Sequence, residues 1–178
     1  MKTHHRLFFA IRPPAGVLGY IVEEQRCFGP GHAVRPEHLH LTTAITEDHA
    51  IFPVAIAEAM RAIGDRIFAD QFPIVLDQIA ASHRSVVMVP SEPLRTFHAF
   101  QRQLACGMAR AGIGQRRDWR FSPHVTLLYR HGAPLRQWTD TLSWTATEFV
   151  LIHSLLGETR HEVLARWPLL APKPPTLH

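Results

Sequence analysis

The same three-residue pattern occurs once in each half of the chain, as His-Leu-Thr at residues 40–42 and His-Val-Thr at residues 124–126. Both copies continue into apolar residues, which indicates a β-strand at each place. Side chains alternate between the two faces of a strand, so each histidine shares a face with its threonine, while Leu41 and Val125 point toward the core. The repeat therefore predicts two similar lobes that bring four polar side chains to one cleft.

Apolar runs and turn residues divide the rest of the chain into strands and helices. Asp48 is the expected N-cap of the second helix and Gly64 its stop signal. The predicted helices are 14–27, 48–63 and 92–111. The predicted strands are 6–12, 39–46, 72–79, 85–89, 123–130, 148–155 and 162–167.

The size and composition suit a globular protein. The chain has 178 residues, of which 46% are apolar and 19% charged, and this allows a sizeable core. We expect one domain over residues 1–171 and a short tail over residues 172–178. The formal net charge of +4 suits an anionic ligand such as RNA, but the basic residues are dispersed and the charge alone decides nothing.

Other sequence signals narrow the class of protein. Cys27 and Cys106 are too few for a disulfide framework or a zinc knuckle, and each is expected to be buried on a helix. The apolar run at residues 7–11 is too short for a signal peptide, and no stretch approaches the length of a membrane span. We therefore expect a cytoplasmic protein without a membrane segment.

The two motifs suit chemistry on a phosphodiester. Cleaving a cyclic phosphodiester with water requires one group that removes a proton and another that donates one. Two histidines can do both near neutral pH, one neutral and one protonated. Residues two apart in a strand are separated by roughly 6.5–7 Å, so the histidine and threonine of one motif could contact the same phosphate.

Two other interpretations of the motifs stay open. A histidine in a half-buried strand is often a structural residue. A metal could bind His38 and His40, which are also two residues apart, but threonines are poor ligands and no cysteine or carboxylate stands at a familiar ligand spacing. The sequence also lacks a glycine-rich phosphate loop for ATP. We therefore expect neither a metal nor a cofactor.

The chain resembles the two-histidine (2H) phosphoesterase superfamily, and within it the bacterial RNA 2′,3′-cyclic phosphodiesterases, also called 2′-5′ RNA ligases. Four segments carry this resemblance in the family's order. They are Arg-Leu-Phe-Phe-Ala-Ile-Arg-Pro-Pro at 6–14, Arg-Pro-Glu-His-Leu-His-Leu-Thr at 35–42, Phe-Ser-Pro-His-Val-Thr-Leu-Leu at 121–128 and His-Glu-Val-Leu-Ala-Arg-Trp-Pro-Leu at 161–169.

The resemblance implies a fold and an activity. The fold is a bilobal α+β domain, with two pseudo-symmetric, antiparallel-rich β-sheets around a central cleft and helices on their outer faces. The activity is metal-independent hydrolysis of RNA 2′,3′-cyclic phosphates to 2′-phosphates, with ligation as a reverse reaction. By this analogy His124 activates water, His40 protonates the departing 3′ oxygen, and Thr42 and Thr126 hold the phosphate.

The sequence departs from the family pattern just after the second motif. Many members carry an arginine five residues after the histidine, where this chain has Tyr129 followed by Arg130. In a regular strand Arg130 would share the face of the motif and could contact the phosphate, whereas Tyr129 would face it only through a β-bulge. Arg117 and Arg120 precede the motif and could contact an RNA backbone.

The expected partners are RNA ends or small cyclic nucleotides, and no protein partner is evident, so we expect a monomer. A related enzyme acting on 2′-5′-linked oligonucleotides or on ADP-ribose cyclic phosphate fits the same motifs. A noncatalytic RNA-binding module with the same fold is the alternative from another class, and salt-sensitive RNA affinity without turnover would favour it.

Overall fold

A computed structural model describes residues 4–171, so the predicted tail at 172–178 lies outside the described residues. The helices are α1 (Ala15–Arg26), α2 (Val54–Gly64) and α3 (Arg95–Arg110), with a short 3-10 turn, η1, at Pro36–His38. The strands are β1 (His4–Ile11), β2 (His32–Ala33), β3 (Leu41–Ile45), β4 (Phe72–Ala81), β5 (Ser85–Val89), β6 (Val125–Tyr129), β7 (Leu135–Ala146), β8 (Glu148–Leu156) and β9 (Arg160–Pro168).

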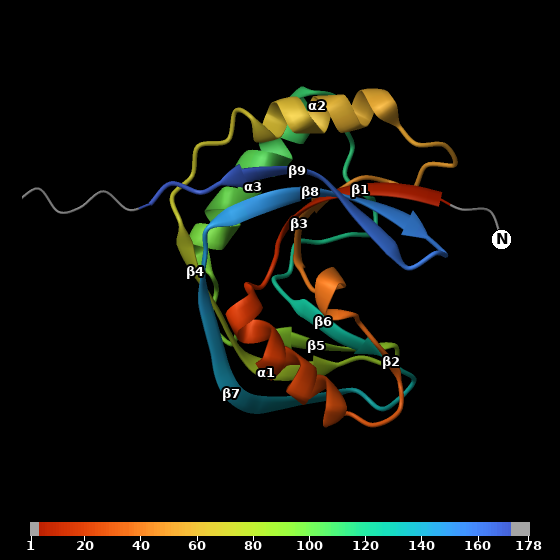
Figure 1. The fold of residues 1–178 in the computed structure, drawn as a ribbon, viewed down its shortest axis with the longest axis vertical. Helices are drawn as coiled ribbons and strands as arrows, with labels where there is room; N and C mark the ends of the chain where they lie inside the picture. Colours follow the sequence, from red (N-terminus) through yellow and green to blue (C-terminus); the bar gives the residue numbers. More distant parts are fainter. Residues whose placement is uncertain (1–3, 172–178) are drawn as a thin grey trace, which may run out of the picture.

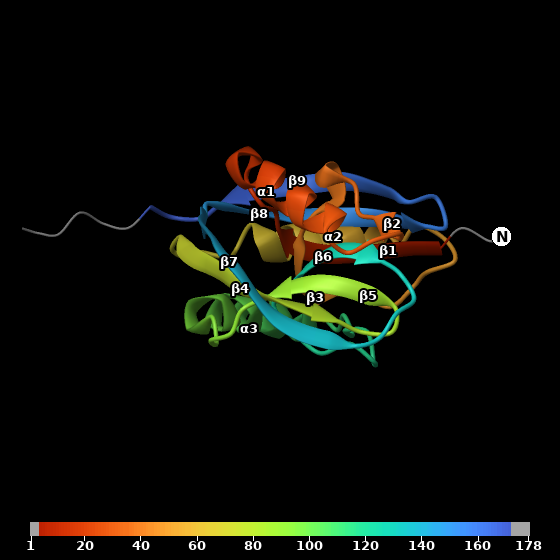
Figure 2. The same cartoon turned by 90° about the horizontal axis from the view of Figure 1, so that it is seen from below.

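The strands form two antiparallel sheets, which confirms the predicted α+β class (Figure 1). The first sheet has the order β3-β1-β8-β9 and the second the order β2-β6-β5-β4-β7. One motif leads into β3 of the first sheet and the other into β6 of the second. Helix α2 lies over the first sheet, and α1 lies beside the second (Figures 1 and 2).

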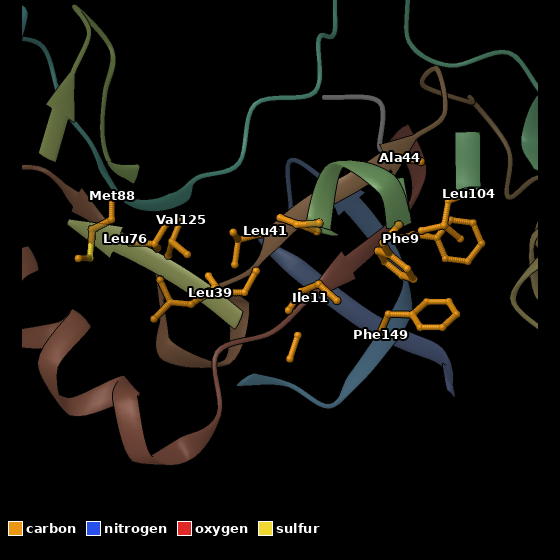
Figure 3. Packing of buried hydrophobic residues seen from close by; sticks show 14 of the residues in the cluster. Phe9, Ile11, Leu39, Leu41, Ala44, Leu76, Met88, Leu104, Val125 and Phe149 are labelled. Carbon is orange, nitrogen blue, oxygen red and sulfur yellow. The ribbon is translucent and has the colours of Figure 1, made fainter. Parts of the chain in front are cut away.

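The two sheets share one core. Alternate β1 residues Leu7, Phe9 and Ile11 are fully buried and belong to the same apolar cluster as Leu76 and Val125 of the second sheet. Figure 3 shows Leu39 and Leu41 between the side chains of the two sheets. Burial of each large apolar side chain contributes about 1.5–3 kcal/mol to folding, so the core fixes the position of the two motif strands relative to each other.

The other face of the first sheet is also apolar and faces the cleft described below. Phe8, Ala10 and Ile45 form a second small cluster there with Val150 and Ile152 of β8. Strand β1 is thus buried on both faces, which explains its nearly continuous run of apolar residues.

The prediction that a helix begins at Asp48 is wrong, because α2 begins six residues later at Val54. The Asp48 carboxylate instead accepts hydrogen bonds of 2.6 and 2.9 Å from Arg6 on β1. Pro53 lies directly before the helix, and proline disfavours helical backbone in the residue before it. The ion pair and the proline therefore keep residues 48–53 in a loop.

Cys27 and Cys106 were predicted to be buried, but both are exposed.

Strand β7 was not predicted from the sequence. Most of β7 is solvent-exposed, and Trp138 keeps 69% of its surface accessible. Its apolar pattern is therefore weak, and the strand is defined by its long pairing with β4. No helix in residues 4–171 is long and apolar enough to span a bilayer.

Candidate active site

A cleft of about 420 Å³ lies where the two sheets face each other. All four motif side chains line it: His40 and Thr42 on one wall, and His124 and Thr126 on the other. The residues between them, Leu41 and Val125, are fully buried in the core. The fold therefore brings together the side chains that the repeated pattern singled out.

A β-bulge follows each motif at the same position. In β3 the pairing with β1 passes from Thr42 to Ala44, so Thr43 is the extra residue. In β6 the pairing with β5 passes from Thr126 to Leu128, so Leu127 is the extra residue. A bulge shifts the alternation of side chains by one residue. The next residue to face the cleft is therefore the third after each threonine.

These two third residues are Ile45 and Tyr129, and both line the cleft. The bulge thus directs Tyr129 to the face on which a regular strand would have placed Arg130. Arg130 does not line the cleft; its guanidinium lies over Gly132, and its buried Nε has no hydrogen-bond partner among residues 4–171. Sequence alternation could not show this, because neither bulge contains glycine or another local signal.

The bulge in β6 is supported by α1. Gln25 is 8% exposed, and its side-chain amide donates hydrogen bonds to the carbonyl oxygens of Val34 and Leu127 at 2.7 and 2.9 Å. The backbone N–H of Val34 donates to the same Leu127 oxygen at 2.8 Å. The carbonyl of the bulged residue therefore has two donors and is fully satisfied.

The two histidines are oriented in the same way. The Nδ1 of His40 lies 2.6 Å from the carbonyl oxygen of His38, and the Nδ1 of His124 lies 2.7 Å from that of Ser122. A carbonyl can only accept, so each Nδ1 carries the hydrogen and donates it. The hydrogen bond fixes the tautomer and leaves Nε2 of both rings for a proton transfer.

The surroundings of His40 keep it neutral. Its ring packs 4.8 Å from the Phe8 ring centre and 5.4 Å from that of His161 on β9, and His161 lies 4.4 Å from His38. Burial, together with the neighbouring His124 and His38, lowers the pKa of His40 to about 4, although the bond to the His38 carbonyl opposes this. Burial likewise lowers the pKa of His161 to about 3.

The structure places the remaining predicted contacts outside the cleft. The backbone N–H of Arg117 donates to Glu47, and Arg120 donates to the carbonyl of Trp119, but neither arginine lines the cleft. Two other arginines, Arg6 and Arg35, do line it. Arg6 could have been found from the sequence, because it alternates with buried residues on the face of β1 that also carries Phe8.

Two other cleft residues were given no role from the sequence. Trp119 comes from a loop, and His161 begins the segment 161–169 that contributed to the family resemblance. In residues 4–171 no group of three or more histidine, cysteine or acidic side chains is arranged to hold a metal ion. The three neighbouring histidines 38, 40 and 161 contact one another through their ring faces and edges instead.

Comparison with known proteins agrees with this architecture. The profile of the 2′-5′ RNA ligase superfamily matches residues 13–158. The chain belongs to this superfamily. It is 30% identical to the RNA 2′,3′-cyclic phosphodiesterase of Escherichia coli K12, over 95% of this chain and 99% of that protein.

Solved structures share the fold. A crystal structure of E. coli LigT complexed with 3′-AMP superposes with a TM-score of 0.79 at 27% identity, over 93% of this chain and 98% of that chain. The protein TT0787 of Thermus thermophilus gives a TM-score of 0.70 at 24% identity, over 92% and 97% of the two chains. The shared fold therefore extends over nearly the whole chain.

Proposed function

We propose that this protein hydrolyses RNA 2′,3′-cyclic phosphodiester ends to 2′-phosphomonoesters without a metal ion, using His40 and His124 as an acid–base pair. One observation carries the proposal. Two imidazoles from different sheets line one cleft, and each has its Nδ1 tied to the carbonyl two residues earlier, so that both Nε2 atoms remain for proton transfer. Membership of the superfamily and the name of the E. coli relative support the same reaction.

The reaction needs two proton transfers. One imidazole takes a proton from water as the water oxygen forms a bond to phosphorus. The bond between phosphorus and the 3′ oxygen then breaks, and the other imidazole gives its proton to that oxygen. The products are a 2′-phosphate and a free 3′-hydroxyl. Each proton transfer of this kind typically contributes about 10²–10⁴-fold to the rate.

The threonines and arginines of the cleft fit the charge of this substrate. The hydroxyls of Thr42 and Thr126 line the cleft on opposite walls and can donate hydrogen bonds to the non-bridging phosphate oxygens, where negative charge develops. Arg6 and Arg35 also line the cleft, although the neighbouring carboxylates of Asp48 and Glu37 offset part of their charge. Tyr129 is 54% exposed there and offers a ring on which a base can stack.

The family resemblance and the electrostatics of the cleft assign the acid and the base to different histidines. The resemblance places the base at His124 and the acid at His40. The pKa of His40, about 4, makes this imidazole neutral at pH 7, and a neutral imidazole is a base. We therefore infer that His40 activates water and that His124 protonates the 3′ oxygen.

Ligation would use the same displacement with a different nucleophile. A 5′-hydroxyl in place of water would attack the cyclic phosphate, and loss of the 3′ oxygen would leave a 2′-5′ linkage. The same two histidines would supply and remove the protons. We propose hydrolysis as the main reaction, because water is far more concentrated than any RNA 5′ end.

The test is to incubate the purified protein with a short RNA ending in a 2′,3′-cyclic phosphate, in excess EDTA, and to identify the product. We expect a 2′-phosphate end. His83→Ala is the matched control, because His83 also has its Nδ1 near a carbonyl, that of Gly132, but lies outside the cleft. RNA binding without conversion would favour a binding module, and activity that returns only with added metal would overturn the metal-free mechanism.

A further inference from the structure

A groove of about 700 Å³ lies between α2 and α3, apart from the cleft that holds the two motifs. Its α2 side is formed by Ala59, Ala62 and Ile63 with Arg66 just after the helix, and its α3 side by Ala99, Arg102, Gln103, Cys106, Gly107 and Arg110. On both helices these residues recur at intervals of three and four, so each helix presents one continuous face. We call this surface the α2–α3 groove.

The floor of the groove is made of small apolar groups. Helices α2 and α3 approach closely where Gly107 meets Ile63; a Cβ at Gly107 would lie 2.7 Å from the Ile63 side chain. The lining face of α3 runs from Ala99 to Arg110, which is about 16 Å at 1.5 Å per residue. A groove of this length matches three turns of a second helix laid along it.

The rim of the groove carries positive charge without a counter-charge. Arg66, Arg102 and Arg110 line it, and no Asp or Glu from residues 4–171 does. None of these three guanidinium groups has a side-chain hydrogen bond or ion pair within the described part of the chain, although arginines elsewhere, such as Arg6 and Arg166, are paired. The unpaired charges therefore favour an acidic ligand.

We propose that the α2–α3 groove is a docking site for an acidic amphipathic helix of a partner protein. The apolar stripe of such a helix would pack on the alanines and Ile63, and its carboxylates would pair with the arginines. Arg102 and Arg110 are two turns apart, about 12 Å along α3, so acidic residues two turns apart on the partner would meet both. Phe68, directly after the groove residue Ile67, is a large apolar side chain that is 75% exposed.

RNA fits the groove less well than a helix does. Single-stranded RNA is held by a charged track together with aromatic rings on which bases stack. No aromatic side chain from residues 4–171 lines the groove, in contrast to the cleft with its Trp119 and Tyr129. An alanine-lined floor offers bases no stacking partner, but it accommodates a closely packed helix.

The test measures binding of a designed peptide by fluorescence anisotropy. The probe is a fluorescein-labelled helical 16-residue peptide with leucine and alanine on one face and glutamate on its flanks. We expect saturable binding in the micromolar range that weakens with salt. Arg102→Glu combined with Arg110→Glu should weaken it at least tenfold, and the same peptide with lysine in place of glutamate should bind this variant better than the wild-type protein.

The position of the peptide can be read from Cys106, an exposed cysteine that lines the groove. In a Cys27→Ser background, bound peptide should slow alkylation of Cys106 by N-ethylmaleimide. Absence of binding at several hundred micromolar, or binding without protection of Cys106, overturns the proposal. Protection by a uridine 20-mer but not by the acidic peptide would show a nucleic-acid surface instead. Unchanged circular dichroism and phosphodiesterase activity of the arginine variant confirm that its fold is intact.

Discussion

The two motif strands have the same backbone but different surroundings. In β3 and in β6, a histidine donates from Nδ1 to the carbonyl two residues earlier, a threonine follows on the same face, and a bulge comes immediately afterwards. The difference lies around the rings. His40 packs against Phe8 and His161, whereas the hydrogen bond of His124 is exposed. The pseudo-symmetry thus orients the two imidazoles in the same way, and the burial of the His40 ring lowers its pKa to about 4.

The largest expected effect comes from removing His40 or His124, and it tests whether the reaction requires both histidines. His40→Ala and His124→Ala should each lower kcat/KM on a cyclic-phosphate RNA by about 10²-fold or more, because each removes one proton transfer. The double variant should lose less than the product of the two losses, because the histidines act as a unit. Turnover near the wild-type level in either single variant, measured beside His83→Ala, would contradict the assignment.

The second prediction separates the acid from the base. In a cyclic substrate whose bridging 3′ oxygen is replaced by sulfur, the thiolate leaves without being protonated. This substrate should restore most of the roughly 10²-fold loss in the variant that lacks the general acid. We expect rescue of His124→Ala and not of His40→Ala in single-turnover assays. Rescue of His40→Ala alone would return the roles to those that the family resemblance implies.

The third prediction uses the low pKa of His40 as a property of the folded state. An unfolded histidine takes up a proton near pH 6.5, but folded His40 does so only near pH 4. The unfolded state therefore binds more protons between these values, so stability is retained above about pH 6.5 and is lost as the pH falls toward 4. His161 acts in the same direction.

Urea titrations at pH 7 and pH 4.5 measure this loss. His40→Phe should reduce the pH-dependent fall in the free energy of unfolding by about 2 kcal/mol relative to the wild-type protein. His161→Phe should change the fall in the same direction, because burial also lowers the pKa of His161, to about 3. A fall in His40→Phe as large as that of the wild-type protein would contradict the low pKa of the buried His40 ring.

The sequence predicted the parts of the site that depend on strand alternation. The motif side chains share a face and their intervening residues Leu41 and Val125 are buried, because a period of two needs no tertiary information. The sequence did not predict which residue lines the cleft beyond the bulge in β6, where the alternation of side chains shifts by one residue. Tyr129 reaches the cleft only because Leu127 is an extra residue whose carbonyl is satisfied by Gln25, which lies far away in the sequence.

The same reasoning explains the errors in the fold. The predicted sheets are confirmed because strands β1, β3, β6 and β8 carry strong apolar patterns. Strand β7 was missed because its residues are mostly exposed and its pairing with β4 defines it. The prediction that a helix begins at Asp48 was wrong. In the sequence, an aspartate that caps a helix looks the same as one that pairs with a distant arginine, here Arg6.

The fourth prediction concerns the support of the β6 bulge. Gln25→Leu should lower the free energy of unfolding by about 1–2 kcal/mol, because the Val34 and Leu127 carbonyls lose a buried donor. It should also raise KM several-fold with a smaller change in kcat, because Tyr129 loses its fixed position. Gln103→Leu, at an exposed helical site, is the control. Unchanged stability and KM in Gln25→Leu would show that the bulge forms without α1.

The smallest expected effect comes from the bulge in β3, which lacks such support. Thr43 is fully buried, and its hydroxyl has no hydrogen-bond partner in residues 4–171. Thr43→Val replaces that hydroxyl with a methyl group of similar size, so we expect the protein to gain about 1 kcal/mol in urea unfolding. The cleft side chains His40 and Thr42 point the other way, so kcat/KM should stay within twofold. A loss of stability would mean that the Thr43 hydroxyl forms a hydrogen bond. The two bulges would then be supported more equally than their packing indicates.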